Sequence, residues 1–374
     1  MLIKHFPPPK TTQRQSGVEL LRIISIFLIC ISHSVQTLEK FVDFHSATTD
    51  PQLLTLQLLR FCGTIGNILF VICSSYFLVN SKKAKAEKAM KILLDSSLIS
   101  IGILCCFIIG CEVFDKKYSF TFITLLSNIF PDMYNQVWFV PTYILFYMIH
   151  PYLNAFIASL KKKEHFLICF FIFIFYGIGS LFSAAPAYSN IIGFISIYFI
   201  ISYLRKYNAA LHFNKKINVI IFVCEVFLFV LCILLKNIMS IRYSFFEGFP
   251  NLDGMCSVVF LPMLISLFNL FLSMDFSSRL INTVASCSLF IYCIHENAIL
   301  RSEVRPKYYE FVFTRFGDGN ALFFALLCAM GMFVGSLLLA LIYKYTFHKI
   351  TEKLGRKLRN SFNNLFDRLF KQIL

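Results

Sequence analysis

The stretch GVELLRIISIFLICISHSV, residues 17–35, decides the fold class, because it is long and apolar enough to cross a bilayer as one helix. It nevertheless contains Glu19, Arg22 and His33. Ionisable side chains inside a membrane are costly and by default indicate a functional site. Eleven residues of helix place Arg22 and His33 on one face, roughly 16 Å apart along the axis. Glu19 lies three residues before Arg22 and can pair with it. The simpler alternative is a buried ion pair plus a hydrogen-bonded core histidine.

The composition places the whole chain in the same class. Hydrophobic residues make up 57% of the sequence and charged residues 15%, and the mean hydropathy is +0.71. Soluble domains are about 45–50% apolar and about 25% charged. We therefore predict an all-α polytopic membrane protein. The polar residues 1–16 are expected to form a cytoplasmic tail and not a cleaved signal peptide, because the apolar run that follows is too long.

The hydrophobic pattern predicts about ten transmembrane helices within a membrane domain over residues 17–345. Residues 119–131 are apolar but too short to cross, which favours an interfacial or re-entrant segment. Residues 346–374 predict a basic amphipathic helix on the inner leaflet, with a partner-binding helix as the alternative. The ten predicted spans are residues 17–38, 55–80, 92–113, 137–157, 166–184, 189–204, 217–238, 254–273, 280–299 and 320–343.

The net charge of +15 is explained by topology. With ten spans, most of the 35 Lys and Arg residues fall on the side of the N-terminus. Cytoplasmic loops carry this excess of positive charge, so we expect both termini in the cytoplasm. Membrane lipids are therefore predicted partners, and nucleic acid is not.

The 13 cysteines indicate no disulfide framework and no metal centre. They lie within apolar segments, and no CxxC pair occurs, so they are expected to behave as small hydrophobic residues. We accordingly expect neither a bound metal nor a bound cofactor.

A second polar cluster occurs in SCSLFIYCIHEN, residues 286–297. Counted from the inner ends of their helices, His295 and His33 both lie roughly 24 Å into the membrane. Two histidines at matched depth can face one cavity together with Glu296. The alternative places His295 at the outer interface, where a polar group costs little.

The remaining intramembrane polar residues permit simple explanations. Trp138 suits an interfacial aromatic belt. Lys82 and Lys83, at the inner end of the second predicted span, suit either phosphate binding or topology alone. Glu225 lies near mid-membrane in the seventh predicted span, and the sequence names no partner for it.

Four stretches resemble the integral membrane O-acyltransferases of acyltransferase family 3, which modify bacterial surface polysaccharides, lipid-linked sugars and peptidoglycan. Arg22 and His33 resemble the family's Arg-x10-His motif. GNILFVICSSYFLV (residues 66–79) is similar to its FFxxSGxFL motif, with Ser75 where the family usually has Gly. Trp138–Phe139 with Tyr143 and Pro151 resembles WFxxxYxxxYxxxP, and SLFIYCIHEN (residues 288–297) resembles SxxIYLIH. The esterase-like domain fused to some members is absent from this sequence.

The resemblance implies transfer of an acyl group, most often acetyl, from cytoplasmic acetyl-CoA to a hydroxyl of an extracytoplasmic or lipid-linked glycan, in the cytoplasmic membrane of a bacterium. His33 is then either the general base or an acyl carrier. His295 and Glu296 are expected to orient His33 or bind the acceptor, and Arg22 to bind CoA or organise Glu19. We assign the binding of CoA to Lys82 and Lys83 as well. We assign the binding of the acceptor to Arg60, Ser75, Trp138 and Asn297.

Two other classes of protein compete with this interpretation. A lipid-linked sugar flippase or polymerase is one alternative, although no large outer loop is present. A proton-coupled transporter is the other, although the sequence has no evident internal repeat.

Overall fold

The computed structural model describes residues 15–370 except 45, 47, 82, 116, 119, 135–136, 183–189, 208–213 and 317–319, and it leaves out the side chains of 359 and 362–370. Throughout these ranges the regular structure is helical, with no strand, which confirms the all-α prediction. Most of the predicted N-terminal tail, residues 1–14, lies outside the described residues.

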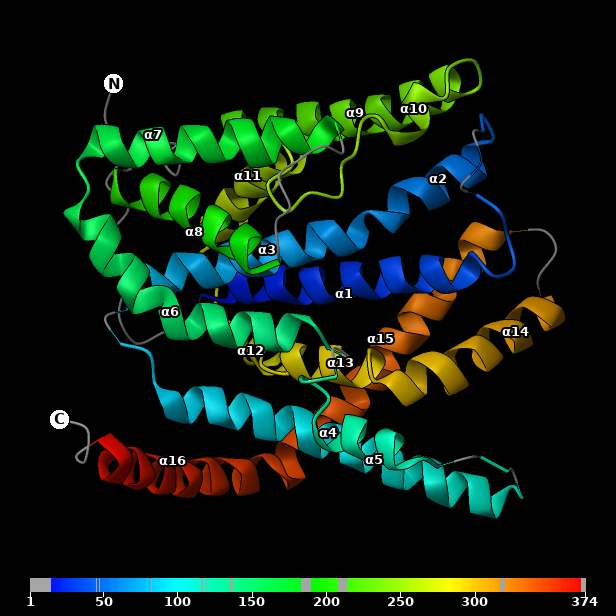
Figure 1. Ribbon diagram of the computed structural model, residues 1–374. Helices are drawn as coiled ribbons and strands as arrows, with labels where there is room; N and C mark the ends of the chain where they lie inside the picture. Colours follow the sequence, from blue (N-terminus) through cyan, green and yellow to red (C-terminus); the bar gives the residue numbers. More distant parts are fainter. Residues whose placement is uncertain are drawn as a thin grey trace.

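The helices follow the apolar segments of the sequence (Figure 1). In chain order they are α1 (Ser16–Leu38), α2 (Pro51–Arg60), α3 (Cys62–Leu78), α4 (Ala86–Val113), α5 (Phe122–Ile129), α6 (Phe139–Ser159), α7 (Lys162–Ile172), η1 (Phe173–Ile178), η2 (Gly179–Phe182), α8 (Asn190–Lys206), α9 (Lys215–Ser240), α10 (Phe245–Gly248), α11 (Phe260–Leu272), α12 (Arg279–Ala285), α13 (Ser288–His295), η3 (Leu300–Val304), α14 (Arg305–Phe316), α15 (Ala321–Thr346) and α16 (His348–Phe370).

Six helical stretches are long and apolar enough to cross a membrane, so the predicted count of ten is not confirmed. Several of the predicted spans without a counterpart among these stretches are shorter or interrupted. Residues 254–273 form regular helix only as α11, and residues 280–299 are divided into α12 and α13. The six stretches are Ser16–Leu38, Pro51–Leu78, Ala86–Val113, Lys162–Phe182, Lys215–Ser240 and Ala321–Thr346.

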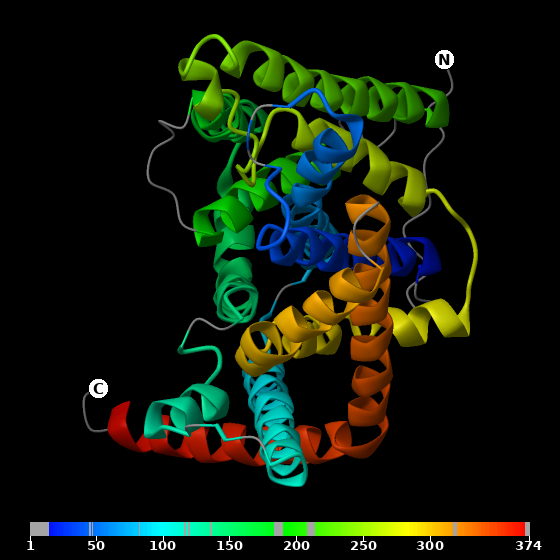
Figure 2. The same cartoon turned by 90° about the vertical axis from the view of Figure 1, so that its right-hand side faces the viewer.

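Helix α1 lies near the middle of the molecule, between a group containing α7, α8 and α9 and a group containing α4 and α16 (Figure 2). It packs against α3, α15, α12 and α11. Close contact with α3 depends on Gly66, because a Cβ atom there would lie 2.5 Å from the carbonyl oxygen of Ser25. Small residues allow such approach in membranes. The helix that carries Arg22 and His33 is therefore enclosed by the rest of the chain.

Helix α16 packs against α4 at the edge of the molecule. Asp95 of α4 accepts hydrogen bonds of 2.7 Å from Thr351 of α16 and from Tyr343 of α15. Lys91 adds an ion pair to Glu352, 3.2 Å long. The predicted C-terminal helix is thus present, and its location on the inner leaflet stays a prediction.

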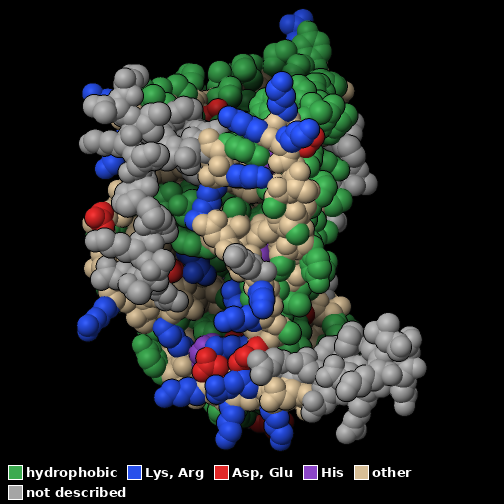
Figure 3. All heavy atoms as spheres, turned by 90° about the vertical axis from the view of Figure 1, so that its left-hand side faces the viewer, with side chains coloured by type: hydrophobic (Ala, Val, Ile, Leu, Met, Phe, Trp, Pro, Cys, Tyr) green, Lys and Arg blue, Asp and Glu red, His purple; other side chains and the backbone are tan. Residues whose placement is uncertain are grey.

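Lysine and arginine side chains are gathered on the face at which α1 begins, seen in Figure 3. The loop before α4, the start of α7, the end of α8 and the start of α9 contribute to this basic end of the molecule. The charge asymmetry agrees in sign with the cytoplasmic side of a membrane protein.

Candidate active site

The chain bends directly after α13, and the bend turns His295 and Glu296 toward α1. Helix α13 ends at His295. Asn297 then begins the next helical stretch, because its Oδ1 accepts the backbone N–H groups of Ile299 (3.0 Å) and Leu300 (3.4 Å). An Asn side chain bonded to the backbone two and three residues ahead is a common helix N-cap.

Three titratable side chains meet at this bend. Nδ1 of His33 lies 2.9 Å from Oε1 of Glu296 and 3.1 Å from Nε2 of His295. The side chain of His295 is fully buried, that of Glu296 is 9% exposed, and that of His33 is 18% exposed. His33 is therefore the member of the cluster that a substrate can approach most easily.

The hydrogen-bond partners assign the protons. Nδ1 of His295 lies 2.8 Å from the carbonyl oxygen of Ile291 and must donate to it, so Nε2 of a neutral His295 is an acceptor. Nδ1 of His33 faces both this acceptor and a carboxylate, so it carries the proton. Nε2 of His33 consequently holds a lone pair, and it forms no hydrogen bond with any described residue. A carboxylate-oriented imidazole with a free lone pair is the arrangement that general bases use.

Two arginines compensate the charge of Glu296. Nη2 of Arg305, at the start of α14, lies 2.9 Å from Oε1 of Glu296 and also donates to the carbonyl oxygen of His295. Arg301 approaches Oε2 at 3.5 Å and is half exposed. Because Arg305 is only 8% exposed, the ion pair is buried and fixes the direction of the carboxylate. A buried charge with its partner and hydrogen bonds in place holds one geometry.

The same region is tied to α1 one residue after His33. Tyr309 of α14 donates to Oγ of Ser34 at 2.5 Å, and Ser34 donates to the carbonyl oxygen of Ala325 in α15 at 2.6 Å. Three helices are thereby fixed around the imidazole of His33.

The family model described as an acyltransferase domain, that of acyltransferase family 3, matches residues 15–346. The chain belongs to acyltransferase family 3. No curated protein and no solved structure is significantly similar to it. Both motifs that meet at the bend, Arg22 to His33 and residues 288–297, lie inside the matched range.

In this acyltransferase the three clustered groups also satisfy the minimum donor set for a metal ion. Three potential ligand atoms lie within 4.8 Å of one another: a ring nitrogen of His33, a ring nitrogen of His295 and a carboxylate oxygen of Glu296. The carboxylate oxygen concerned already accepts from the guanidinium of Arg305, whose fixed positive charge disfavours a second cation there. We therefore interpret the cluster as a hydrogen-bond relay, and the absence of a bound metal stays a prediction.

The predicted partners Glu19 and Arg22 form their ion pair, with Nη1 3.1 Å from Oε2. Arg22 also lies over the ring of Phe70, 5.6 Å from its centroid. This pair belongs to the first turns of α1, toward the basic end, and Arg22 is separated from His33 by roughly 16 Å along the helix. Lys83 is exposed in the loop before α4, and Lys82 lies outside the described residues.

Arg60 lies toward the opposite end of the molecule, at the end of α2. Its carbonyl oxygen accepts from Ser32, the neighbour of His33, at 2.6 Å. Its guanidinium pairs with Glu39 at 3.2 Å and with Asp253 at 3.9 Å. Arg60 also lines a cavity of about 620 Å³ with a mixed polar wall. Further lining residues are Gln57, Lys236, Asn237 and Glu247.

The other residues assigned to the acceptor have packing or capping contacts. Ser75 is fully buried in α3, and its Oγ forms no hydrogen bond with any residue whose placement is described. The amide of Asn297 is engaged, because Nδ2 donates to Ser100 at 3.0 Å while Oδ1 caps the backbone. Trp138 stacks edge-on against Phe139, whose backbone N–H is 3.4 Å from the hydroxyl of Tyr292. The structure thus connects Trp138 to α13 without placing it against His33.

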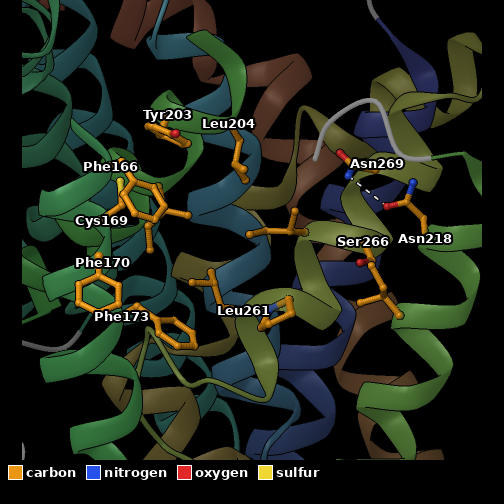
Figure 4. A pocket seen from close by; sticks show the side chains of 14 residues that line it. Phe166, Cys169, Phe170, Phe173, Tyr203, Leu204, Asn218, Leu261, Ser266 and Asn269 are labelled. Carbon is orange, nitrogen blue, oxygen red and sulfur yellow. Dashed lines mark hydrogen bonds between the residues drawn. The ribbon is translucent and has the colours of Figure 1, made fainter. Parts of the chain in front are cut away.

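A second cavity, of about 390 Å³, lies between α7, α8, α9 and α11 and is almost wholly apolar (Figure 4). Its polar side chains include Asn218 and Asn269, which are hydrogen-bonded to each other at 3.2 Å. None of the predicted site residues lines it.

The sequence analysis missed Arg301 and Arg305. Both follow the ninth predicted span, beyond the residues to which the sequence analysis assigns a role. Their spacing of four residues on a helix, soon after the His–Glu pair, is the signal that could have identified them.

Proposed function

We propose that this membrane acyltransferase transfers an acyl group, acetyl in the simplest case, from acyl-CoA to a hydroxyl of an extracytoplasmic or lipid-linked glycan. The observation that carries the proposal is the direction of the His33 imidazole. Its Nδ1–H is directed at Glu296 and His295, which leaves Nε2 as the basic nitrogen.

The acceptor hydroxyl is the group that needs this base. A thioester already has a good leaving group, whereas a sugar hydroxyl is a poor nucleophile. Nε2 of His33 removes the hydroxyl proton as the oxygen attacks the thioester carbonyl. The C–S bond then breaks, and the imidazolium returns the proton to the departing CoA thiolate. The products are the O-acyl glycan and free CoA, with no net change at His33.

Glu296 supports the charged state of this cycle. When His33 becomes an imidazolium, its positive charge forms 2.9 Å from the carboxylate oxygen. Arg305 prevents the carboxylate from turning away. Charge stabilisation by groups that are already oriented is a major source of catalysis in enzymes.

A covalent route uses the same nitrogen. Nε2 of His33 attacks the thioester, CoA leaves, and the acyl-imidazole then passes its acyl group to the hydroxyl. The acceptor must lose its proton to another base in the second step. Acid quench within one turnover, with acetyl-CoA labelled in its acetyl group, separates the routes, because only the covalent route leaves label on His33.

The two substrates are assigned to opposite ends of the molecule. The basic end that contains Arg22 and Lys83 suits the phosphates of CoA. The polar cavity beside Arg60 suits a hydroxylated acceptor, because amides, charged groups and aromatic rings share its wall. Arg60 is joined through its carbonyl to Ser32, next to His33, which brings the cavity wall close to the base.

The experiment is incorporation of labelled acetyl from acetyl-CoA into surface glycan, comparing wild type with His33→Ala at matched membrane levels. Label that depends on His33 is the expected result. Equal labelling by the variant would overturn the role of His33. If wild type leaves the surface glycan unlabelled and changes glycan export instead, the flippase or transporter alternative is favoured.

A further inference from the structure

The guanidinium of Arg205 is a partly buried cation without an acidic partner among the residues that the structure describes. Arg205 belongs to the last turn of α8. Its Nη1 is shielded from solvent and has no hydrogen-bond partner in the described part of the chain. No ion pair joins Arg205 to any described carboxylate. Shielding such a group without a counter-charge is unfavourable, so the arrangement is incomplete as it stands.

The neighbouring side chains position Arg205 without neutralising it. Its Cζ lies 4.1 Å from the ring centroid of Tyr76, a cation–π contact that fixes the plane of the guanidinium. The ring of Tyr76 is itself held by Phe268, at 5.2 Å between centroids. The nearby hydroxyl of Tyr198 donates instead to Asn154 at 2.5 Å.

The positive charges near Arg205 favour an anionic ligand. Lys206 is the next residue, and its Nζ bonds the carbonyl oxygen of Ile157 at 2.8 Å. Both residues belong to the basic end of the molecule. A planar guanidinium that is held in place and surrounded by positive charge is well suited to a phosphate, which it can bind through two parallel hydrogen bonds.

Helix α3 connects this position with the active site. Tyr76 contacts Arg205 near the end of α3, and Phe70, six residues earlier, contacts Arg22. At the start of α3, Gly63 lies against Ser32, the neighbour of His33. The distance along α3 from residue 63 to residue 76 is about 20 Å. The C-terminal part of α3 therefore contacts Arg205, its middle contacts Arg22, and its start lies next to the neighbour of His33.

We propose that Arg205, stacked on Tyr76, binds a phosphate group of the acyl-CoA donor. This inference rests on the proposed function, in which acyl-CoA is the donor. CoA carries its phosphates at one end and its thiol at the other end of a long flexible arm. Phosphate held at Arg205 directs the arm along α3, past Arg22, toward His33.

The test compares CoA with pantetheine, which lacks the nucleotide phosphates. Dissociation constants are measured by calorimetry on the full chain in nanodiscs of zwitterionic lipid. Wild type is expected to bind CoA at least tenfold more tightly than pantetheine. Arg205→Met is expected to weaken CoA binding about tenfold and leave pantetheine binding unchanged, with Arg205→Lys between them. Arg315→Met, in the last turn of α14, is the matched control and is expected to bind CoA as wild type does, because Arg315 is exposed and belongs to neither the proposed phosphate site nor the His33 cluster.

The outcomes separate this inference from the function on which it rests. If wild type binds neither CoA nor pantetheine, the assignment of acyl-CoA as the donor is overturned. CoA binding by Arg205→Met equal to wild type overturns the role of Arg205 alone. A loss of binding to CoA and pantetheine alike also overturns it, because it indicates general damage to the fold. If Arg205→Met is not recovered folded, Arg205→Gln undergoes the same comparison.

A phosphate on a lipid headgroup has the same chemistry, and a second arm distinguishes it. The measurements are repeated in nanodiscs that contain phosphatidylglycerol. If Arg205→Met changes only the retention of phosphatidylglycerol and not the affinity for CoA, the anion is lipid and the proposal is wrong.

Discussion

Nδ1 of His33 in α1 lies 2.9 Å from Oε1 of Glu296, the residue that directly follows α13. This contact gives the imidazole one proton position and one direction. The contact also joins the Arg22–His33 motif to the motif of residues 288–297. Each motif alone has a simple structural explanation, but together they form one cluster of titratable side chains.

Glu296→Gln tests the charge of that group. Gln keeps the size and an accepting oxygen but removes the negative charge that stabilises the imidazolium of His33. We expect acyl transfer to fall by about 10²-fold or more. We also expect a lower thermal stability, because Gln leaves the buried guanidinium of Arg305 without its counter-charge. Initial rates at saturating acetyl-CoA measure the effect. A rate within threefold of wild type would show that Glu296 is not needed for the charge on His33.

Arg305→Met tests the buried ion pair. The change leaves Glu296 buried with its negative charge uncompensated, so we expect a loss of about 3–5 kcal/mol in the free energy of unfolding. Arg301→Met is the control and is expected to cost about 0–1 kcal/mol, because Arg301 is half exposed and 3.5 Å away. Denaturant unfolding in detergent measures both. The double variant Arg305→Met with Glu296→Gln should recover part of the lost free energy of unfolding. If the effects of the two substitutions on this free energy simply add, the pairing is contradicted.

Gly66→Ala tests the close packing of α1 on α3. The added methyl group would lie 2.5 Å from the carbonyl oxygen of Ser25 and 2.7 Å from the side chain of Ile29. We expect a loss of about 1–3 kcal/mol from this overpacking, measured as a lower midpoint of thermal unfolding. Gly102→Ala in α4, where no atom lies within 4 Å of the new methyl group, is the matched control. Equal effects of the two substitutions would be inconsistent with the described packing.

Asp132 gives the protein a pH dependence outside its spanning helices. Burial in the turn between α5 and α6 raises the pKa of this carboxyl from 3.8 to about 6, and the hydrogen bond from Ser96 opposes the rise only in part. A raised pKa means that the ionised form destabilises the fold. This cost is complete above pH 6 and disappears as the pH falls toward 4.

Asp132→Asn should therefore stabilise the protein at pH 7 by about 1–3 kcal/mol and have no effect near pH 4. Thermal unfolding between pH 4.5 and 7.5 measures the difference between variant and wild type. Stabilisation that is independent of pH would exclude the buried carboxylate as its cause.

Removal of metal tests the interpretation of the His33 cluster as a hydrogen-bond relay. We expect dialysis against EDTA to leave acyl transfer unchanged, because Arg305 already supplies the positive charge next to Glu296. Activity that is lost on dialysis and restored by Zn²⁺ would show that the three donor atoms hold an ion.

Much of the fold followed from the sequence because lipid imposes strong constraints on single helices. The apolar runs predicted the helices, and three residues of spacing predicted the Glu19–Arg22 ion pair. The division of residues 280–299 into α12 and α13 was not predicted, because the apolar pattern of SCSLFIYCIHEN continues across the break.

The site depended more strongly on tertiary contacts. Asn297, which the sequence analysis assigns to the acceptor, caps the next helical stretch. Arg305, to which the sequence analysis assigns no role, is buried against Glu296. Side-chain roles of this kind are set by neighbours that are distant in the sequence, and hydropathy carries no information about them.

The sequence by itself determined that this chain is a helical membrane protein with Arg22 and His33 on one face of its first helix, because hydrophobic length and helical periodicity are local properties. Only the tertiary structure decided that His33 meets His295 and Glu296, that Arg305 pairs with Glu296, and that Arg205 stacks on Tyr76. Those contacts arise where helices pack together, and the close approach of glycines such as Gly66 sets their distances.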